Sequence, residues 1–224
     1  MSYSVAIDGP AGAGKSTIAK LLAAKMNYIY VDTGAMYRAM AVYFSQNNVN
    51  PSDEDAINEA VKNVDITICY EDGVQQVILN GENVTSILRT EQTGKMASMT
   101  SKYAAVRTKL VDLQRKLADT SNVIMDGRDI GTTVLPNAFA KIFLTASSDA
   151  RAQRRFKELT EKGEECNFDD IKADIEQRDY EDSHRAISPL KQADDAVLLD
   201  TSDMSIEQVV EAMVKIIDEK KASV

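Results

Sequence analysis

A glycine-rich segment near the start of the chain constrains the fold more than any other feature. Residues 9–16 read Gly-Pro-Ala-Gly-Ala-Gly-Lys-Ser, which matches the pattern G-x-x-x-x-G-K-[ST]. A mostly apolar run at residues 4–7 precedes the segment, and a helical pattern with Ile18, Leu21 and Leu22 on one face follows it. A strand, a loop and a helix in this order predict a phosphate-binding loop, whose glycines let backbone N–H groups approach an anion. The alternative, which this context disfavours, is a glycine turn that binds nothing.

Within this loop, two side chains have distinct expected roles. The helix that begins near Lys15 adds its N-terminal donors and the positive end of its dipole. We expect Lys15 to reach the β- and γ-phosphates of ATP, and the Ser16 hydroxyl to coordinate Mg²⁺. The residues expected around the ATP phosphates are Gly9, Pro10, Ala11, Gly12, Ala13, Gly14, Lys15, Ser16 and Thr17.

Short apolar runs alternate with helical stretches along much of the chain. They lie at residues 5–7, 29–31, 123–125, 141–144 and 197–199. Buried strands between helices predict a parallel sheet that is covered on both faces, so the expected fold class is α/β. Four of these runs end near Asp or Thr. Ligands of such sheets bind at the carboxyl ends of the strands, where these residues fall.

Residues 63–90 interrupt the alternation. Apolar and polar residues alternate over 66–70, and the pairs Asp-Gly at 72–73 and Asn-Gly at 80–81 are typical of hairpin turns. Together they predict a small antiparallel meander inserted into the α/β core. The pattern then predicts a long helix over about 91–119 and an amphipathic helix over 205–220, with Ser205 and Gln208 as a capping box.

Composition excludes several classes of function. The net charge of −9 argues against a large nucleic-acid surface. No apolar run is long enough to cross a membrane and no signal peptide is recognisable, so we expect a cytoplasmic protein. Cys69 and Cys166 lack metal-type spacing and fit ordinary reduced thiols, and the single histidine, His184, has no companion for a zinc site. No surface pattern indicates an oligomer, so we expect a monomer.

Two motifs follow the second and third predicted strands. In Asp-Thr-Gly-Ala-Met-Tyr-Arg at 32–38, we expect Thr33 to cap the next helix and Arg38 to lie on its first turns, which suits a second phosphate group. A helix cap followed by a surface arginine is the alternative. In Met-Asp-Gly-Arg-Asp-Ile-Gly at 125–131, Asp126 stands where an acidic residue supports Mg²⁺, directly or through water. The glycines there predict a tight turn that exposes Arg128 and Asp129, and the alternative is a structural salt bridge.

Two further clusters place cations on helix faces. Arg151, Arg154 and Arg155 share one face, and a charged stretch at 161–165 follows them. They suit a lid that closes over a triphosphate, or alternatively a solvated basic face. A second stretch has the spacing Arg-Asp-x-x-Asp-x-x-Arg, which aligns residues 178, 182 and 185 on one face. That stripe suits an anion and a sugar hydroxyl, and a surface ion pair is its alternative.

With these motifs in this order, the chain resembles the bacterial-type cytidylate kinases, a family of P-loop nucleoside monophosphate kinases, from residue 4 to about residue 220. The resemblance implies one domain with a five-stranded parallel sheet in the order 2-3-1-4-5 and helices on both faces. It also implies a core over about 1–60 and 103–224, a nucleotide-binding insert over about 61–102 and a lid over about 151–168. The expected reaction transfers the γ-phosphate of ATP to CMP, and also to dCMP, with Mg²⁺.

The resemblance also assigns roles to single residues. The catalytic set would be Lys15, Arg128, Arg151, Arg154 and Arg155. Thr33, Arg38, Arg128 and Arg185 would contact the CMP phosphate, Ser98, Arg107 and Asp129 the cytosine, and Arg178 and Asp182 the ribose. Two alternatives remain open at this point: a small-molecule kinase of similar fold, such as shikimate kinase, and a regulator that binds nucleotide without transferring phosphate.

Overall fold

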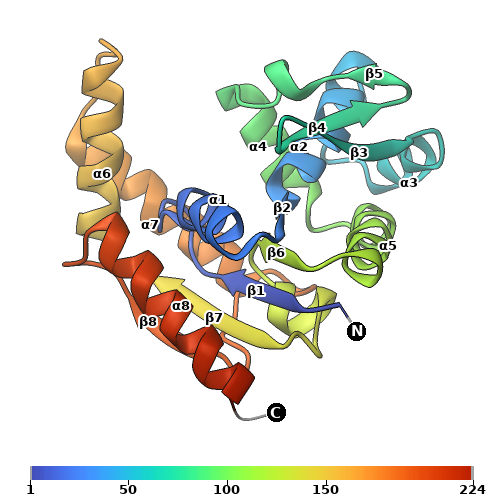
Figure 1. Cartoon of the computed structure of the whole chain (residues 1–224). Helices are drawn as coiled ribbons and strands as arrows, with labels where there is room; N and C mark the ends of the chain where they lie inside the picture. Colours follow the sequence, from blue (N-terminus) through green and yellow to red (C-terminus); the bar gives the residue numbers. More distant parts are fainter. Residues whose placement is uncertain (1, 223–224) are drawn as a thin grey trace.

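A five-stranded parallel sheet forms the centre of the computed structural model, which describes residues 2–222 (Figure 1). Its strands are β1 (Ser4–Asp8), β2 (Ile29–Asp32), β6 (Val123–Asp126), β7 (Ala140–Thr145) and β8 (Val197–Asp200). They lie in the order β2-β6-β1-β7-β8, and every neighbouring pair is parallel. Counted within this sheet alone, the order is 2-3-1-4-5, which confirms the expected fold class and topology.

Helices cover both faces of the sheet. The helices α1 (Lys15–Met26) and α8 (Ile206–Ala222) pack on one face, and α2 (Thr33–Gln46) and α5 (Ala104–Thr120) pack on the other. Side chains alternate along a strand. Val5 and Ile7 of β1 therefore belong to the hydrophobic core beneath α1 and α8, and Ala6 belongs to the core beneath α2 and α5. Both cores meet at β1, which leads directly into the phosphate-binding loop.

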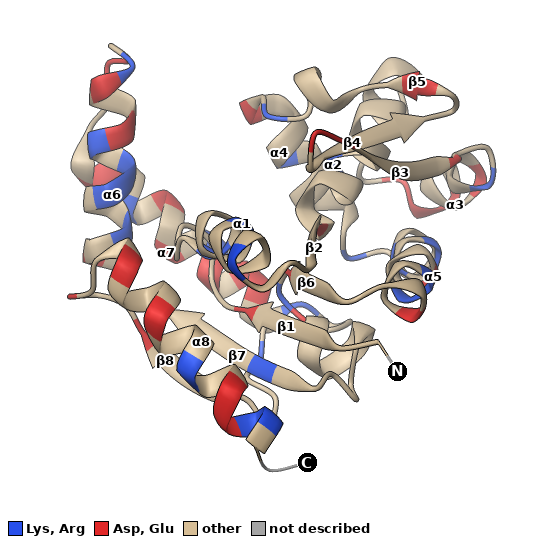
Figure 2. Ribbon diagram, in the orientation of Figure 1, with Lys and Arg blue, Asp and Glu red and all other residues tan. Residues whose placement is uncertain are grey.

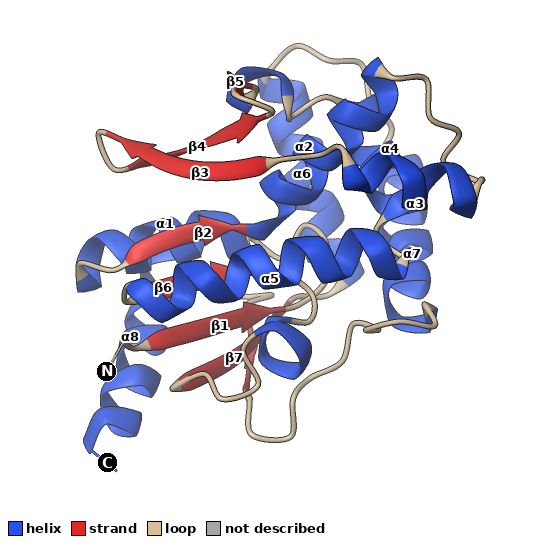
Figure 3. Ribbon diagram, turned by 90° about the vertical axis from the view of Figure 1, so that its right-hand side faces the viewer, coloured by secondary structure: helices blue, strands red, loops and turns tan. Residues whose placement is uncertain are grey.

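The predicted meander is present as a second sheet beside the core (Figures 1 and 3). After α3 (Glu54–Lys62), the strands β3 (Ile66–Glu71), β4 (Val74–Leu79) and β5 (Glu82–Asn83) pair antiparallel in that order. The predicted Asp-Gly and Asn-Gly turns at 72–73 and 80–81 all have positive φ. A short helix, η1 (Thr85–Ile87), then leads to α4 (Glu91–Thr100). The exact division into core, insert and lid stays a prediction.

The single long helix predicted over 91–119 is wrong. The chain forms α4 and α5 instead, separated by Ser101, Lys102 and Tyr103. Tyr103 has an extended backbone, its side chain is buried, and its hydroxyl donates to the Pro51 carbonyl at 2.8 Å. This tertiary anchor outweighs the helical propensity of the sequence, and the resulting break turns the chain beside the site described below.

The remaining elements frame the ends of the strands. A π-helical turn, η2 (Ile130–Val134), follows β6, and the helices α6 (Ser148–Glu161) and α7 (Phe168–His184) form a hairpin after β7. The helix α8 begins as predicted: Gln208 and Ser205 exchange the two hydrogen bonds of a capping box. Within residues 2–222, no helix is long and apolar enough to cross a membrane.

Candidate active site

A cavity of about 720 Å³ lies between the phosphate-binding loop, the insert and the α6–α7 hairpin. Every arginine of the chain except Arg115 lines it, although the net charge of the chain is −9. Away from the cavity, acidic and basic residues are interleaved, as the charged residues of α8 illustrate in Figure 2. The chain therefore concentrates guanidinium groups at one place, which suits anionic ligands.

Nearly all the residues that the sequence predicts for the site line this one cavity. They are Ala11, Gly12, Ala13, Gly14, Lys15, Ser16, Thr17, Thr33, Arg38, Ser98, Arg107, Asp126, Arg128, Asp129, Arg151, Arg154, Arg155, Arg178, Asp182 and Arg185. Gly9 and Pro10 do not line it, because they are buried at the base of the loop. The contact that each residue makes with a ligand stays a prediction.

The phosphate-binding loop takes a conformation that side chains would forbid. Gly9 has φ +147°, and a Cβ there would come within 1.9 Å of the Leu144 carbonyl oxygen. Gly12 and Gly14 have φ of +75° and +83°, in the region that favours glycine. Gly14 also caps α1 with no side chain over the helix end, so the first backbone N–H groups of α1 face the cavity.

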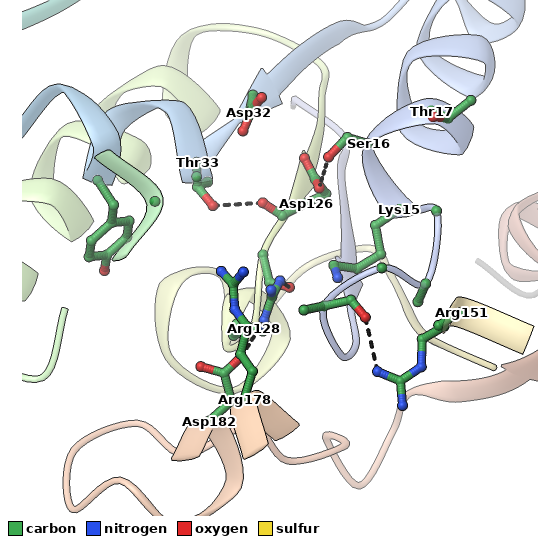
Figure 4. Close-up of a pocket in the computed structure, with 18 of the residues that line it drawn as sticks. Lys15, Ser16, Thr17, Asp32, Thr33, Asp126, Arg128, Arg151, Arg178 and Asp182 are labelled. Carbon is green, nitrogen blue, oxygen red and sulfur yellow. Dashed lines mark hydrogen bonds and ion pairs between the residues drawn. The ribbon is translucent and has the colours of Figure 1, made fainter. Parts of the chain in front are cut away.

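Lys15 sits at the centre of the cavity wall. Its ammonium donates to the Pro10 carbonyl at 2.6 Å, and the residue is 5% exposed. Burial and the neighbouring Arg128 guanidinium lower the pKa of Lys15, whereas Asp126 and Asp8 raise it. The side chain points toward Arg128 in Figure 4, from the opposite side of the cavity. A phosphoryl group between the two would lie between two cations.

Ser16 and Asp126 meet where the sequence predicts a magnesium site (Figure 4). The Ser16 hydroxyl donates to Asp126 Oδ2 at 2.9 Å, and the Tyr30 hydroxyl donates to Asp126 Oδ1 at 2.8 Å. Burial, together with Asp32, raises the pKa of Asp126, while Lys15 lowers it. A hydroxyl and a carboxylate are oxygen donors of the kind Mg²⁺ takes. They fit a cation that keeps several waters and binds chiefly through substrate phosphates.

Tyr30 contacts a residue of the predicted site, and the sequence analysis missed it. It lies on β2, and nothing in its local pattern distinguishes it from other strand residues. Burial, followed by the charges of Asp126 and Asp32, raises the pKa of Tyr30, so its hydroxyl stays protonated and remains a donor. Only the pairing of β2 with β6, which places Asp32 opposite Asp126, brings the tyrosine to this carboxylate.

The predicted role of Thr33 as a helix cap is wrong. Asp32 caps α2, since its Oδ1 accepts from the Ala35 N–H at 2.9 Å. Thr33 is the first residue of the helix, and its hydroxyl donates to the Asp126 carbonyl at 2.6 Å. Asp32 caps the helix because it has an extended backbone directly before the first helical residue, whereas Thr33 already lies within the helix. Arg89, which no motif singled out, reaches Asp32 Oδ2 at 3.0 Å and also lines the cavity.

Arg128, Asp182 and Arg185 form a charged cluster in the wall of the cavity. Arg128 Nε donates to Asp182 Oδ2 at 2.8 Å, and Arg185 Nη1 lies 3.8 Å from Asp182 Oδ1. Burial alone would raise the pKa of Asp182, but the charge and hydrogen bond of Arg128 hold it below its usual value. Arg185 Nη2 is buried with no hydrogen-bond partner among the described residues. A buried cationic N–H group without a hydrogen bond, in a residue that lines this cavity, suits an anionic ligand.

Asp129 differs from its expected exposed position. The carboxylate is 5% exposed and forms an ion pair with Arg107, which is itself 4% exposed. Asp129 also lies 3.9 Å from Arg185 Nη2. The turn therefore exposes Arg128 more than Asp129, because the buried Arg107 from α5 holds the carboxylate inward. Ser98 of α4 lines the same cavity, so the break between α4 and α5 places residues from both helices at one end of it.

The three arginines of α6 have different surroundings. Arg151 is buried: it donates to the Ala11 carbonyl at 2.9 Å and pairs with Asp179 of α7. Arg154 donates to the Thr201 carbonyl, beyond β8. Arg155 is about half exposed and pairs with Glu158 at 2.9 Å. Arg151 thus ties the α6–α7 hairpin to the phosphate-binding loop.

Arg38 and Arg178 retain uncommitted donors. Among residues 2–222, neither has a hydrogen bond or an ion pair with another side chain. Arg178 nevertheless lies beside Arg128 and Asp182 in Figure 4. Gln114, which the sequence analysis also missed, lines the cavity with both amide atoms buried and unpartnered. Nothing in the sequence indicates that Gln114 is buried in the cavity, because a glutamine on a helix is ordinarily solvated.

Comparison with known proteins assigns the family. The family model described as cytidylate kinase matches residues 5–219. The chain belongs to the cytidylate kinase family. It is 52% identical to a cytidylate kinase of Lactobacillus johnsonii over 217 residues, which cover 97% of this chain and 94% of that protein. It is 50% identical to a cytidylate kinase of Leuconostoc mesenteroides, with 97% of each chain covered. The resemblance found in the motifs is thereby confirmed.

A solved structure supports the fold alone. An uncharacterized protein from Eubacterium ventriosum superposes with a TM-score of 0.52 at 13% sequence identity, and the match covers 98% of this chain and 99% of that one. At this identity the likeness concerns the arrangement of strands and helices. The assignment to the cytidylate kinase family rests on sequence, and the fold of the chain agrees with it.

Proposed function

We propose that this protein transfers the γ-phosphate of ATP to CMP, and also to dCMP, giving ADP and the nucleoside diphosphate. The observation that carries the proposal is one cavity with a phosphate-binding loop on one wall and Arg38, Arg128 and Arg185 on the other. Two anionic substrates must meet for such a reaction, and cations on opposite walls make that meeting favourable. Membership of the cytidylate kinase family supports CMP as the acceptor.

The donor would occupy the phosphate-binding loop. Backbone N–H groups of residues 11–17 would hold the β- and γ-phosphates, and Lys15 would neutralise charge that develops during transfer. Beyond the loop, the cavity wall includes Thr201, Met204 and Ile206. This partly apolar end suits a purine ring, so the adenine would lie there.

Ser16 and Asp126 would hold Mg²⁺, Asp126 through water. The ion would neutralise the β- and γ-phosphates of the bound donor. Both oxygens of the Asp126 carboxylate already accept hydrogen bonds, at 2.8 and 2.9 Å. A coordinated water could donate to the remaining lone pairs without displacing Ser16 or Tyr30.

The acceptor needs no general base. A phosphate monoester is largely dianionic at neutral pH, because its second pKa is about 6, so its oxygen is already a nucleophile. Thr33, Arg38, Arg128 and Arg185 would orient it in line with the γ-phosphate. Catalysis would then consist of positioning and charge stabilisation by Lys15, Mg²⁺ and the arginines of α6. The lone histidine, His184, lies exposed on α7 and plays no part.

Base and sugar selection would use the remaining cluster. The Asp129 carboxylate, held by Arg107, would accept from the cytosine N4 amino group, and Ser98 would contact the same ring. Uracil would present a carbonyl to that carboxylate, a mismatch that costs about 1–3 kcal/mol. Arg178 and Asp182 would face the ribose hydroxyls. We further propose that the enzyme acts as a cytoplasmic monomer without nucleic-acid or membrane partners.

An acceptor panel tests the proposal. ADP release would be measured with ATP, Mg²⁺ and either CMP, dCMP, UMP, AMP or shikimate as acceptor. We expect release with CMP and dCMP far above the rest. A small-molecule kinase would favour shikimate or another small acid, which needs neither the insert nor a base-facing pair. A nucleotide-binding regulator would give the same background with every acceptor, and either result would end the proposal.

A further inference from the structure

The side chain of Asp8 connects the phosphate-binding loop with the segment that carries Arg128 and Asp129. Asp8 is the last residue of β1 and directly precedes Gly9, the first residue of the phosphate-binding loop. Its Oδ1 accepts from the Ile130 N–H at 2.7 Å, and its Oδ2 accepts from the Gly131 N–H at 2.7 Å. The residue is 5% exposed. One carboxylate therefore connects the donor loop to the start of η2.

The segment between β6 and η2 is anchored to β1 at both ends. At its start, the Gly127 N–H donates to the Ile7 carbonyl at 3.0 Å. At its end, the bonds to Asp8 hold the first two residues of η2. Arg128 and Asp129 lie between these anchors. The position of both side chains relative to the donor loop thus depends on consecutive residues of β1.

The packing around this carboxylate leaves no slack. A Cβ on Gly131 would lie 3.2 Å from Asp8 Oδ2 and 3.1 Å from Lys141 Cδ. Burial raises the pKa of Asp8 to about 6, although the two N–H donors and Lys15 lower it. A buried carboxylate is costly to keep, and an asparagine of the same size has one oxygen where this geometry uses two. The site retains the costlier group, which suggests that both bonds matter.

We propose that Asp8 is a positioning residue, which fixes Arg128 and Asp129 in register with the phosphate-binding loop. The inference rests on the proposed function, since it assigns these two residues to the acceptor. Asp8 does not line the cavity. Loosening its two bonds would displace the acceptor phosphate and the base-reading carboxylate together, while the loop that holds ATP keeps its own backbone bonds and glycines. Displacements of about 1 Å at a transfer site cost on the order of 100-fold in rate.

Kinetics of the variant Asp8→Asn test this role. We expect kcat/KM for CMP to fall roughly 10- to 100-fold. We also expect the ratio of kcat/KM for CMP over UMP to fall at least severalfold, while the dissociation constant of ATP, measured by calorimetry without acceptor, changes less than about twofold. The ratio is the decisive readout, because it does not depend on the fraction of folded enzyme. If Asp8 served only stability, the substitution would lower kcat/KM for CMP and for UMP by the same factor, and their ratio would not change.

Two further variants complete the design. Asp53→Asn alters an exposed carboxylate that also accepts from a backbone N–H, that of Ala56 at 3.0 Å, but does not line the cavity, and should keep the wild-type ratio. Gly131→Ala crowds Asp8 from the other side and should lower the ratio in the same direction, by a smaller factor. If Asp8→Asn does not fold, the CMP-to-UMP ratio of Gly131→Ala tests the proposal instead. Wild-type enzyme inactive on CMP would overturn the proposed function, whereas active wild type with an unchanged ratio in the folded variants would overturn only this inference.

Discussion

The donor and acceptor sides of the cavity are built in different ways. The proposed donor side is one continuous segment, residues 9–17, in which glycines would present mostly backbone N–H groups to the phosphates. The acceptor side consists of side chains from five places: the start of α2, the α4–α5 break, the segment after β6, α7 and the loop after η1. Local conformation determines the first. The second exists only once the whole sheet and its crossover helices have formed.

This difference predicts how each side tolerates substitution. A backbone cradle has few side chains to remove, so its function concentrates in Lys15 and Ser16. On the proposed acceptor side, recognition would be spread over several ion pairs, such as Arg107 with Asp129 and Arg128 with Asp182. Removing one member of such a pair leaves the other buried and unpaired, so binding defects and folding defects become mixed there. Variants on this side therefore need a polar replacement of the same shape.

The largest expected effect concerns the donor side, where few side chains are expected to contribute. Lys15→Ala should lower kcat by about 1,000-fold or more, because it removes the cation beside the transferred phosphoryl group. The fold should persist, because the ammonium of Lys15 makes a single hydrogen bond in the described part of the chain, to the Pro10 carbonyl, and its burial disfavours the charged form. Steady-state kinetics with CMP and thermal melting check both statements. Lys25→Ala, on the exposed face of the same helix, is the matched control. Near-normal turnover in folded Lys15→Ala would refute the assignment of the donor side.

The next effect concerns the acceptor side and tests which residue distinguishes cytosine from uracil. Asp129→Asn should raise kcat/KM for UMP relative to CMP by about 10-fold or more, because the amide can donate to the uracil carbonyl where the carboxylate could only accept. Asn is preferred to Ala, which would leave Arg107 buried and unpaired at a cost of about 3–5 kcal/mol. Paired assays with CMP and UMP measure the ratio. Unchanged discrimination in the folded variant would mean that another group reads the base.

A smaller effect concerns the sugar. Asp182→Asn should lower kcat/KM for CMP more than for dCMP, by a factor of about 10, because it removes a charged acceptor for ribose hydroxyls. It also weakens the bond from Arg128, so both substrates should lose some activity. Asp174→Asn on the exposed side of α7 serves as the control. Equal losses for CMP and dCMP would assign Asp182 to orienting Arg128 alone.

The same division explains what could be predicted from the sequence. The phosphate-binding loop, the strands around it and the hairpin turns are encoded within about ten residues each, and the structure confirms their places. Even some contacts of the acceptor side follow from spacing, since residues 182 and 185 share one end of α7. Expectations limited to a few neighbouring residues were therefore the safest.

Predictions that depended on distant neighbours were the ones that were wrong or incomplete. The helix break at Tyr103 depends on a carbonyl at Pro51, and the inward position of Asp129 depends on Arg107. Tyr30 and Asp8 reach the site only through pairing of β2 with β6 and packing of β1 against η2. Each of these contacts spans more than twenty positions of sequence, and no local pattern records them.

The smallest expected effect tests whether residues outside the phosphate-binding loop also support the donor side. Tyr30→Phe removes the hydroxyl that donates to Asp126 Oδ1 and leaves the bond from Ser16 in place. A single hydrogen bond to a charged group contributes about 1.5 kcal/mol, so the Mg²⁺ concentration for half-maximal rate should rise roughly tenfold while kcat at saturating Mg²⁺ changes little. Tyr28→Phe, just before the same strand, is the control. Identical Mg²⁺ dependence in wild type and Tyr30→Phe would show that the donor side relies on its own segment alone; a shift would show that β2 sustains it through Asp126.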